Sequence, residues 1–340
     1  MKQMKRGAKT GVVLQQHYHN SRRLGIDIFN TLLNLDLDNT DYVIFDVRDI
    51  SGRVYIDIDL KNSIPQKEFW PFFRQMVRLC WEKNVKIYFG LPGLHNATVD
   101  YDNIVLDNGE TFPGRICPSS ERCRGEYIDF LEAVRQKYGG GSRIFLPFFR
   151  YPPATRGLSC FCDKCSAHME NIFGRKISAE DIVSDFQVYL KWQEYRCRNI
   201  SEFIRDVKAA TGLYLALEVD FDPARNWELG ILQNDCQDLR LIKDHIDECI
   251  VHFYDKSGYA RFAEDRNSSH KMISAYAFFR QLHDYNLKYS VFFWNNGDSY
   301  EEFQDKWEFA CSVNAETVFF LVNENQTEYI NRLNERRMKR

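Results

Sequence analysis

The sequence predicts an α/β fold, a single (β/α)8 barrel, on the strength of two observations. Short apolar, β-branched or aromatic runs recur along the 340-residue chain, and longer stretches with helical periodicity separate them. Parallel strands joined by helices show this alternation, and eight such units close into a barrel. The eight expected strands are Val12–Gln16, Tyr42–Val47, Val85–Leu91, Arg143–Arg150, Leu213–Phe221, Cys249–Tyr254, Tyr289–Trp294 and Thr317–Val322.

The connections between these runs carry helical signals. Asp185–Thr211 is one helical stretch, and the Gly212 that follows it is a common helix stop. Ser178 and Asp181 form a capping-box pattern shortly before that stretch. Two further helices are expected at Gln66–Lys83 and Glu126–Tyr138, and the glycines at 139–141 predict a turn before a strand.

Two connections differ from this pattern. Ser51 and Gly52 separate 46–49 from 54–58, which predicts a two-stranded extension after the second strand. The segment Asn96–Cys117 is long, polar and turn-rich, which predicts a loop over the barrel mouth. No repeat or linker interrupts the chain, so we expect one barrel domain over residues 10–330, with polar, basic termini at 1–9 and 331–340.

Composition narrows the classes of function. An apolar content of 44% and a charged content of 27% suit a soluble domain. A net charge of −3 and a pI of about 6.3 do not favour a nucleic-acid or anionic-membrane partner. Without a signal-peptide pattern or a run of about 18 apolar residues, the expected location is cytoplasmic. The aromatic content of 15% fits either a bulky core or ring faces that line a sugar-binding cleft.

The most informative motif is a cysteine cluster. Cys160, Cys162 and Cys165 stand in the sequence CFCDKC, soon after the fourth expected strand. Clustered thiols in a cytosolic chain bind metal more often than they form disulfides. A fourth thiolate, such as that of the upstream Cys117, would close a tetrahedral site, so we expect a structural zinc loop after strand four. We interpret the remaining thiols as ordinary core or surface residues, namely Cys80, Cys197, Cys236, Cys249 and Cys311.

Candidate catalytic groups lie at the fifth expected strand. Inward-pointing side chains near the carboxyl ends of barrel strands face the active-site mouth. Glu218 and Asp220 alternate with apolar neighbours and therefore share one face, which we expect to be the inner face. Buried carboxylates are costly unless they are paired, bound or used. The pair is therefore either catalytic or part of an ion-pair network with Arg48 or Arg150.

Other strand ends supply further candidates. Asp46 and Arg48 share a face at the end of the second strand and form either an internal ion pair or part of a site. Glu324 follows the eighth strand, where a carboxylate suits acid, base or nucleophile work or else lies on the rim. Side chains typical of contacts with polyhydroxylated ligands are His17, His19, His95, Arg150, Tyr151, His252, Tyr254, Trp294 and Asn295. Three of these, His17, His19 and His95, are alternatively ligands of a catalytic metal.

Three stretches resemble TIM-barrel glycoside hydrolases. Tyr42–Tyr55 looks like strand two of uncharacterised glycosyl-hydrolase barrels, and Ile116–Arg124 resembles the segment that opens the helix before their fourth strand. Phe148–Pro152 together with Cys160–Cys165 is similar to their strand four and to the C-x-C-x-x-C zinc loop of bacterial beta-galactosidases. A cysteine in a matching C-P-N-S-like segment completes that zinc site, which implies Cys117 rather than Cys123 as the fourth ligand.

The chain also departs from these galactosidases. They carry an Asn-Glu pair near the end of strand four, where this chain has Phe149, Arg150 and Tyr151. They place the nucleophile at strand seven, which here ends in Trp294 and two asparagines. Neither usual carboxylate is therefore carried over by the resemblance.

Together these observations predict a glycoside-hydrolase-like barrel that hydrolyses or binds an oligosaccharide or glycoside. Glu218 and Glu324 are the expected acid/base and nucleophile pair, with Asp220 and Asp46 as electrostatic or hydroxyl-binding partners. The first alternative is a carbohydrate-binding barrel that has lost hydrolysis, which the missing carboxylates at strands four and seven suggest. The second is a metalloenzyme that uses the histidines.

Overall fold

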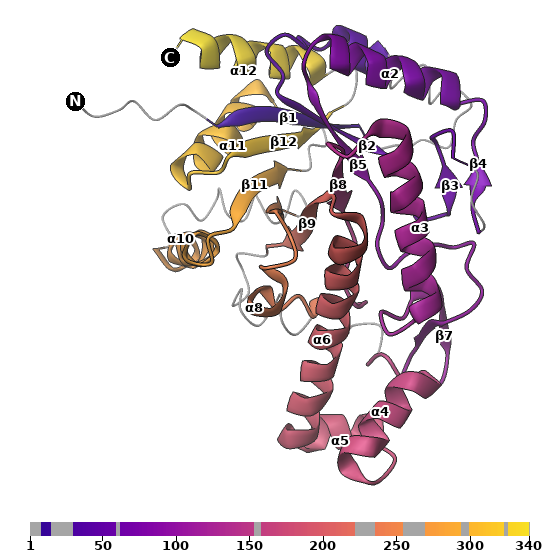
Figure 1. The fold of residues 1–340 in the computed structure, drawn as a ribbon. Helices are drawn as coiled ribbons and strands as arrows, with labels where there is room; N and C mark the ends of the chain where they lie inside the picture. Colours follow the sequence, from indigo (N-terminus) through magenta and orange to yellow (C-terminus); the bar gives the residue numbers. More distant parts are fainter. Residues whose placement is uncertain are drawn as a thin grey trace.

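The computed structural model contains a closed barrel of eight parallel strands (Figure 1). The structure describes residues 8–14, 30–58, 62–152, 158–221, 235–253, 269–293, 299–322 and 326–339. Around the barrel the strands follow the order β1-β12-β11-β10-β9-β8-β5-β2. Their bounds are β1 Lys9–Leu14, β2 Tyr42–Asp46, β5 Lys86–Gly90, β8 Arg143–Leu146, β9 Tyr214–Asp220, β10 Glu248–Phe253, β11 Lys288–Phe293 and β12 Thr317–Leu321. The predicted (β/α)8 architecture is confirmed, and each strand overlaps its predicted run.

One strand is shorter than the sequence predicts. The fourth strand was expected to reach Arg150, yet β8 ends at Leu146. Pro147 has no backbone N–H to donate to a neighbouring strand, and Phe148 has a φ of +59°, which turns the chain out of the sheet. Phe149, Arg150 and Tyr151 therefore belong to a loop at the carboxyl end of the barrel.

Helices cover the outside of the barrel. The predicted long helices are present as α2 Trp70–Glu82, α3 Glu121–Tyr138 and α6 Phe186–Thr211, and Gly212 ends α6 in the left-handed conformation. Ser178 and Asp181 form the predicted capping box, which begins the short helix α5 Ala179–Ser184. With α4 Asp163–Phe173 and the start of α6, α5 forms an arm that projects from the barrel (Figure 1). The remaining helices are α8 Leu239–Ile242, α10 Ser269–Asp284, α11 Tyr300–Ser312 and α12 Thr327–Lys339.

Two small two-stranded sheets lie in the connections that follow β2 and β5. Arg48 bridges Val54 in antiparallel fashion across Ser51 and Gly52, as predicted, and β3 Arg53–Val54 then pairs in parallel with β4 Ile64–Pro65. The segment 96–117 was expected to be a loop, but it contains the antiparallel strands β6 Asn103–Val105 and β7 Thr111–Ile116. A tight turn with Gly109 at a φ of +81° joins them. The Asn-Gly pair at 108–109 is a hairpin signal that the polar composition concealed.

Two apolar layers hold the barrel together. The inner layer fills the cylinder with inward-facing side chains that include Tyr42, Tyr88, Phe145, Ile250 and Phe319. The outer layer lies between the strands and the helices and contains most of the buried apolar residues. Alternation along each strand assigns successive residues to the two layers, as period-two geometry requires.

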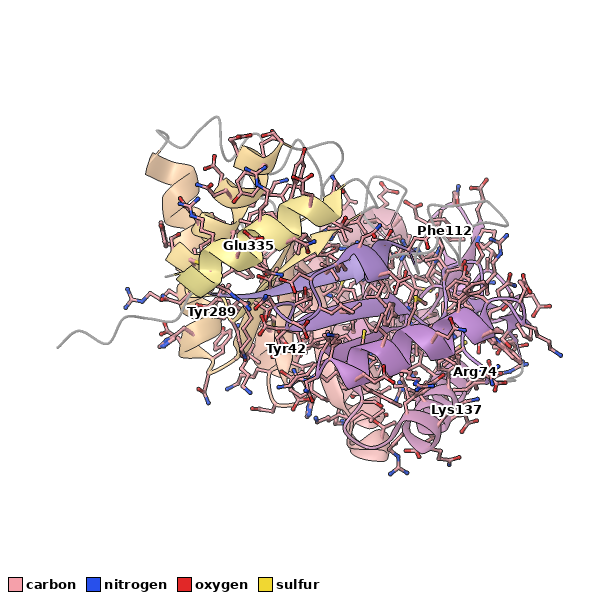
Figure 2. All side chains as sticks on the ribbon, turned by 90° about the horizontal axis from the view of Figure 1, so that it is seen from above. Tyr42, Arg74, Phe112, Lys137, Tyr289 and Glu335 are labelled. Carbon is pink, nitrogen blue, oxygen red and sulfur yellow. The ribbon has the colours of Figure 1, made fainter. Side chains whose placement is uncertain are left out.

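The starts of the barrel strands and the hairpin lie on opposite sides of the molecule. Tyr42, the first residue of β2, and Tyr289, near the start of β11, lie on one side of the molecule in Figure 2, and Phe112 of the hairpin lies on the other. At the bottom, Glu248 accepts hydrogen bonds from Tyr88 (2.6 Å), Tyr214 (3.1 Å) and Ser290.

None of the described helices combines the length and hydropathy that crossing a bilayer requires.

Candidate active site and thiol cluster

The carboxyl ends of β9 and β10 bring three titratable side chains together. Ala216 of β9 and Ile250 of β10 belong to the inner layer, so Glu218, Asp220 and His252 face inward as well. Asp220 and His252 are register partners across the two strands. One ligand atom of each of the three residues lies within 4.8 Å of the others. The inner face predicted for the two carboxylates is the face that they occupy.

Polar contacts hold the Glu218 carboxylate on both sides. Nδ1 of His252 lies 3.0 Å from Oε1 of Glu218, and the backbone N–H of Phe148 donates to Oε2 at 2.9 Å. The His252 ring in turn stacks on Phe292, with 4.5 Å between ring centroids. Burial favours the neutral acid, but the hydrogen bond from His252 and the charge of Arg150 lower the pKa of Glu218 to about 2. Glu218 is therefore a buried, ionised and immobilised group.

Asp220 follows Glu218 by two residues on the same face of β9 and therefore lies closer to the mouth. Its side chain is 22% exposed, whereas that of Glu218 is 4% exposed. Arg150 forms an ion pair with its Oδ2, and Nδ1 of His252 lies 3.4 Å from its Oδ1. Oδ1 is buried and accepts no hydrogen bond from the described part of the chain. The loop that leaves β8 early thus supplies both Phe148 and Arg150 to the cluster.

Asp235, which the sequence analysis did not single out, is a further acid near this cluster. Burial raises its pKa to about 6 against the opposing charge of Arg150, and the charge of Glu218 adds to the rise. Its carbonyl oxygen accepts the N–H of Tyr151 at 3.3 Å. Two residues on, Gln237 donates to the carbonyl oxygens of Glu218 (2.9 Å) and Phe149 (3.1 Å). Asp235 stands in no motif or alternating run of the sequence, so no sequence pattern marked it.

The second and third strands place their predicted residues elsewhere. Arg48 donates to the carbonyl oxygen of Pro92 at 2.9 Å, and its guanidinium lies 5.9 Å from the Tyr127 ring centroid and 5.7 Å from that of Phe130, both on α3. Burial and the charges of Arg115 and Arg48 lower the pKa of His95 to about 4, so its imidazole is neutral. Arg48 therefore lies in a buried region under α3, whereas His95 forms an isolated bridge with Arg115 of β7.

Asp46 ends β2 as a buried residue, 2% exposed. A Cβ atom built on Gly90 of β5 would lie 2.5 Å from its Oδ1, so the carboxylate occupies the space that the glycine leaves. The other predicted site residues lie outside the described part of the chain. They are His17, His19, Tyr254, Trp294, Asn295 and Glu324.

The four cysteines predicted to bind metal share one centre. Sγ of Cys117 lies 3.5 Å from that of Cys165 and 3.7 Å from that of Cys162, and the sulfurs of all four, Cys160 included, lie within 4.8 Å of one another. Zinc bound tetrahedrally with Zn–S distances of about 2.3 Å requires S–S separations of about 3.8 Å. The spacing therefore fits a four-thiolate zinc site.

Hydrogen-bond donors and a buried ring surround the thiol cluster. The N–H groups of Val105 and Cys162 both donate to Sγ of Cys160 at 3.4 Å, and the Ser119 hydroxyl lies 3.0 Å from Sγ of Cys117. Such contacts orient and stabilise thiolates around a metal. Fully buried Tyr151 lies beside the thiols, which raise its pKa further than burial alone does. Tyr151 therefore connects this cluster to Arg150 of the mouth and is not a sugar-facing residue of the described site.

Comparisons with known proteins identify the fold. Neither a family model nor a curated protein sequence matches the chain. The structure is similar to the glycoside hydrolase domain of PgaB (BpsB) from Bordetella bronchiseptica, with a TM-score of 0.69 and 12% identity over 96% of this chain and 98% of that one.

Two further solved structures have the same barrel. The catalytic domain of beta-amylase from Paenibacillus polymyxa gives a TM-score of 0.61 and 11% identity over 96% of this chain and 99% of that one. Alpha-L-fucosidase isoenzyme 2 from Paenibacillus thiaminolyticus gives 0.62 and 13% over 97% of this chain and 49% of that one. The chain therefore has a TIM-barrel fold like that of glycoside hydrolases, as its sequence motifs suggested.

Proposed function

We propose that the chain is a glycoside hydrolase that uses Asp220 as its reacting carboxylate and Asp235 as its general acid. The observation that carries the proposal is the contrast between the Glu218 and Asp220 carboxylates and the Asp235 carboxyl group, which interacts electrostatically with Arg150 and Glu218. Arg150 pairs with Asp220, and Glu218 is held ionised, whereas Asp235 is held protonated up to a pH of about 6. Glycoside hydrolysis needs this combination of a carboxylate and a carboxylic acid.

Accessibility favours Asp220 over Glu218 as the group that meets the sugar. Oε2 of Glu218 accepts the N–H of Phe148, Oε1 lies 3.0 Å from Nδ1 of His252, and the side chain is almost fully buried. Oδ1 of Asp220 is buried without a donor among the described residues, a state that costs about 1–3 kcal/mol and that a ligand hydroxyl or water would relieve. Glu218 acts in this scheme as a positioning residue, which orients His252 against Asp220. The sequence-based role of Glu324 stays a prediction.

The proposed chemistry follows from these positions. Asp235 donates its proton to the glycosidic oxygen as the bond to the anomeric carbon breaks, and the leaving group departs as a neutral alcohol. The Asp220 carboxylate either attacks the anomeric carbon or removes a proton from the water that attacks it. The nearby negative charges of Glu218 and Asp220 stabilise the positive charge that develops on the sugar ring.

A leaving-group series tests this proposal. The Asp235→Asn variant lacks the acid, so hydrolysis of glycosides with poor leaving groups, such as methyl glycosides, should fall by about 100-fold or more. Hydrolysis of 2,4-dinitrophenyl glycosides, whose leaving group needs no proton, should fall far less. The Asp220→Asn variant should lose both activities. Equal losses for both leaving groups in the Asp235→Asn variant would contradict the assigned acid, and wild-type protein that turns over no glycoside of a broad panel would contradict hydrolysis.

The second candidate is a carbohydrate-binding barrel without catalysis. The observation in its favour is that Arg150 and Tyr151 stand where the beta-galactosidases carry their Asn-Glu pair, and that Arg150 already occupies Oδ2 of Asp220. Titration calorimetry with oligosaccharides, run beside the turnover assays, separates the two functions. Sugar binding that depends on Asp220 without any turnover favours the binding barrel.

We also propose that Cys117, Cys160, Cys162 and Cys165 hold a structural zinc ion. The near-tetrahedral sulfur spacing and the donors to Cys160 and Cys117 support this assignment. Four thiolates fill the coordination sphere of zinc and leave no position for substrate. The ion would join the hairpin of β6 and β7 to the start of α4, and would anchor the loop that carries Arg150 through Tyr151.

A further inference from the structure

A second group of cysteines, outside the proposed zinc site, lies between α6 and the residues that precede α8. Cys197 belongs to the buried face of α6, and Cys236 directly follows Asp235. Both cysteines are buried, and their thiols are hydrogen-bonded to each other. Because the two residues are far apart in the sequence, only the fold reveals that they form a pair.

One amide side chain contacts both sulfurs. Nε2 of Gln193, one helical turn before Cys197, lies 3.7 Å from Sγ of Cys197 and 3.5 Å from Sγ of Cys236. Its Oε1 accepts a hydrogen bond from Nη1 of Arg196 at 3.1 Å, which leaves the amide nitrogen turned toward the sulfurs. Since a single nitrogen atom reaches both thiols, the two sulfurs face the same small space.

A buried cation lies near this pair. The guanidinium of Arg196 lies 4.4 Å from the ring centroid of Tyr151 and 4.1 Å from that of Trp192. Burial opposes ionisation of Cys236, but the hydrogen bond with the Cys197 thiol and the charge of Arg196 lower its pKa. The hydrogen bond to Cys236 in turn raises the pKa of Cys197. The surroundings therefore favour a thiolate at Cys236 that accepts a hydrogen bond from the Cys197 thiol.

Metal binding does not account for the pair. A protein site for a thiolate-bound metal ion usually has three or four protein ligands. Among the described residues, three or more possible ligand atoms converge around Cys117 and around Glu218, but not around Cys197 and Cys236. A thiolate beside a cation and in contact with a second thiol is instead typical of cysteines that are readily oxidised.

We propose that Cys197 and Cys236 form a redox-active pair that a small peroxide converts into a disulfide. In the first step the Cys236 thiolate attacks one oxygen of hydrogen peroxide, the O–O bond breaks, hydroxide leaves and Cys236 becomes a sulfenic acid. In the second step the Cys197 sulfur attacks the Cys236 sulfur, and the S–O bond breaks. The departing hydroxide takes the Cys197 proton and leaves as water. The two thiols together lose two electrons and two protons, and the peroxide is reduced to two molecules of water.

The disulfide would form next to the acidic cluster. Its bond is shorter than the hydrogen bond that it replaces, so its closure draws Cys236 toward α6. Cys236 lies between Asp235 and Gln237 in the chain, and Gln237 donates to the carbonyl oxygens of Glu218 and Phe149. Formation of the disulfide does not depend on the proposed function. Only its effect on hydrolysis does, through the position of Asp235.

Differential alkylation tests the proposal on the unaltered protein. The protein is treated with hydrogen peroxide, the remaining thiols are alkylated after denaturation, and the peptides are mapped by mass spectrometry. A peptide that joins Cys197 to Cys236 should appear, and dithiothreitol should remove it. Labelling of Cys236 should be lost at least about tenfold faster than that of Cys80, a buried thiol whose pKa burial raises to about 12. The absence of the linked peptide, or equal rates at Cys236 and Cys80, would overturn the assignment.

Serine variants separate the two steps. In Cys197→Ser the second thiol is missing, so peroxide should leave a sulfenic acid at Cys236, and its dimedone adduct should be at least about fivefold more abundant than in the wild-type protein. Cys311→Ser is the matched control, because Cys311 lies on α11 and is not part of the pair. This control should still form the linked peptide. An unchanged amount of adduct in Cys197→Ser, or loss of the linked peptide in Cys311→Ser, would contradict the proposed pair.

Discussion

At the scale of single residues, neighbouring acids differ because their surroundings differ. Glu218 is as buried as any core residue, yet His252, Arg150 and the N–H of Phe148 keep it ionised. Nearby charges offset the burial of Asp235 less completely, so its pKa is raised and it keeps its proton to a higher pH. Two identical chemical groups thus receive different roles from hydrogen bonds and charge, which is the way in which enzymes separate an acid from a base.

This difference predicts the pH dependence of hydrolysis. The general acid must be protonated, so kcat/KM should fall as the pH rises through about 6, the pKa of Asp235. Glu218, with a pKa of about 2, stays ionised over the range of the assay and should cause no fall on its acid side. Initial rates with a methyl glycoside between pH 3 and 9 measure the profile. In the Asp235→Asn variant the fall near pH 6 should disappear, and a fall that persists there would assign it to another group.

At the scale of elements, the loop between β8 and α4 connects the mouth to the thiol cluster. It carries Phe148 and Arg150 to the acidic cluster, Tyr151 to the thiols, and then the three clustered cysteines. Loops of this length need internal anchors, because their backbone entropy otherwise opposes a fixed geometry. A zinc ion would supply such an anchor.

Removal of one thiol tests this anchor. The Cys162→Ser variant should lose about one zinc ion per chain, measured by elemental analysis after dialysis, and its arm of α4 and α5 should become more sensitive to proteolysis. Cys311→Ser is the control, because Cys311 lies on α11 and is not one of the four clustered cysteines. This variant should keep its zinc. Zinc-free wild-type protein, or full zinc retention in Cys162→Ser, would refute the structural zinc site.

Substitution of a glycine tests the packing beneath the loop between β8 and α4. A Cβ atom built on Gly93 would lie 1.9 Å from the Phe149 ring, which is fully buried against Phe203 at 5.1 Å between centroids. Gly93→Ala should therefore lower the free energy of unfolding by about 1–3 kcal/mol, measured in urea. Gly125→Ala, on the exposed face of α3 with no atom near the new methyl, should raise it by about 0.5–1 kcal/mol. A neutral Gly93→Ala variant would show that Phe149 moves freely.

At the scale of the whole molecule, the bottom of the barrel holds a buried hydrogen-bond network and the mouth holds the acidic cluster. Glu248 accepts three hydroxyl hydrogen bonds from side chains of β5, β9 and β11, and so ties four strands together inside the cylinder. Burial raises its pKa against the effect of these donors. This arrangement follows the general division of such barrels into a stabilising N-terminal end and a reactive C-terminal end.

The bottom network should matter for stability and not for hydrolysis. Glu248→Ala leaves three buried hydroxyls without their acceptor and should lower the free energy of unfolding by about 3 kcal/mol or more, measured in urea. Glu316→Ala, which removes a half-exposed ion pair with Lys9, should cost at most about 1 kcal/mol. Equal effects of the two substitutions would contradict the role given to Glu248.

The sequence by itself determined the barrel, the inner face of β9 and the four metal-binding candidates. Each of these rests on local information: period-two and helical patterns record which side of a strand or helix is buried, and clustered thiols have few uses apart from metal binding. The polar composition of 96–117 predicts a loop, whereas its Asn-Gly turn joins the two strands of a hairpin at 103–116.

Only the tertiary structure decided which groups meet. The sequence left the acids of β9 open to either Arg48 or Arg150, and the turn at Pro147 and Phe148 places Arg150 beside Asp220. Arg48, close to Asp46 in sequence, packs instead under α3, and Asp235 gains its raised pKa from residues far away in the chain. Burial and electrostatic environment are sums over neighbours from several strands, and no local pattern encodes those sums.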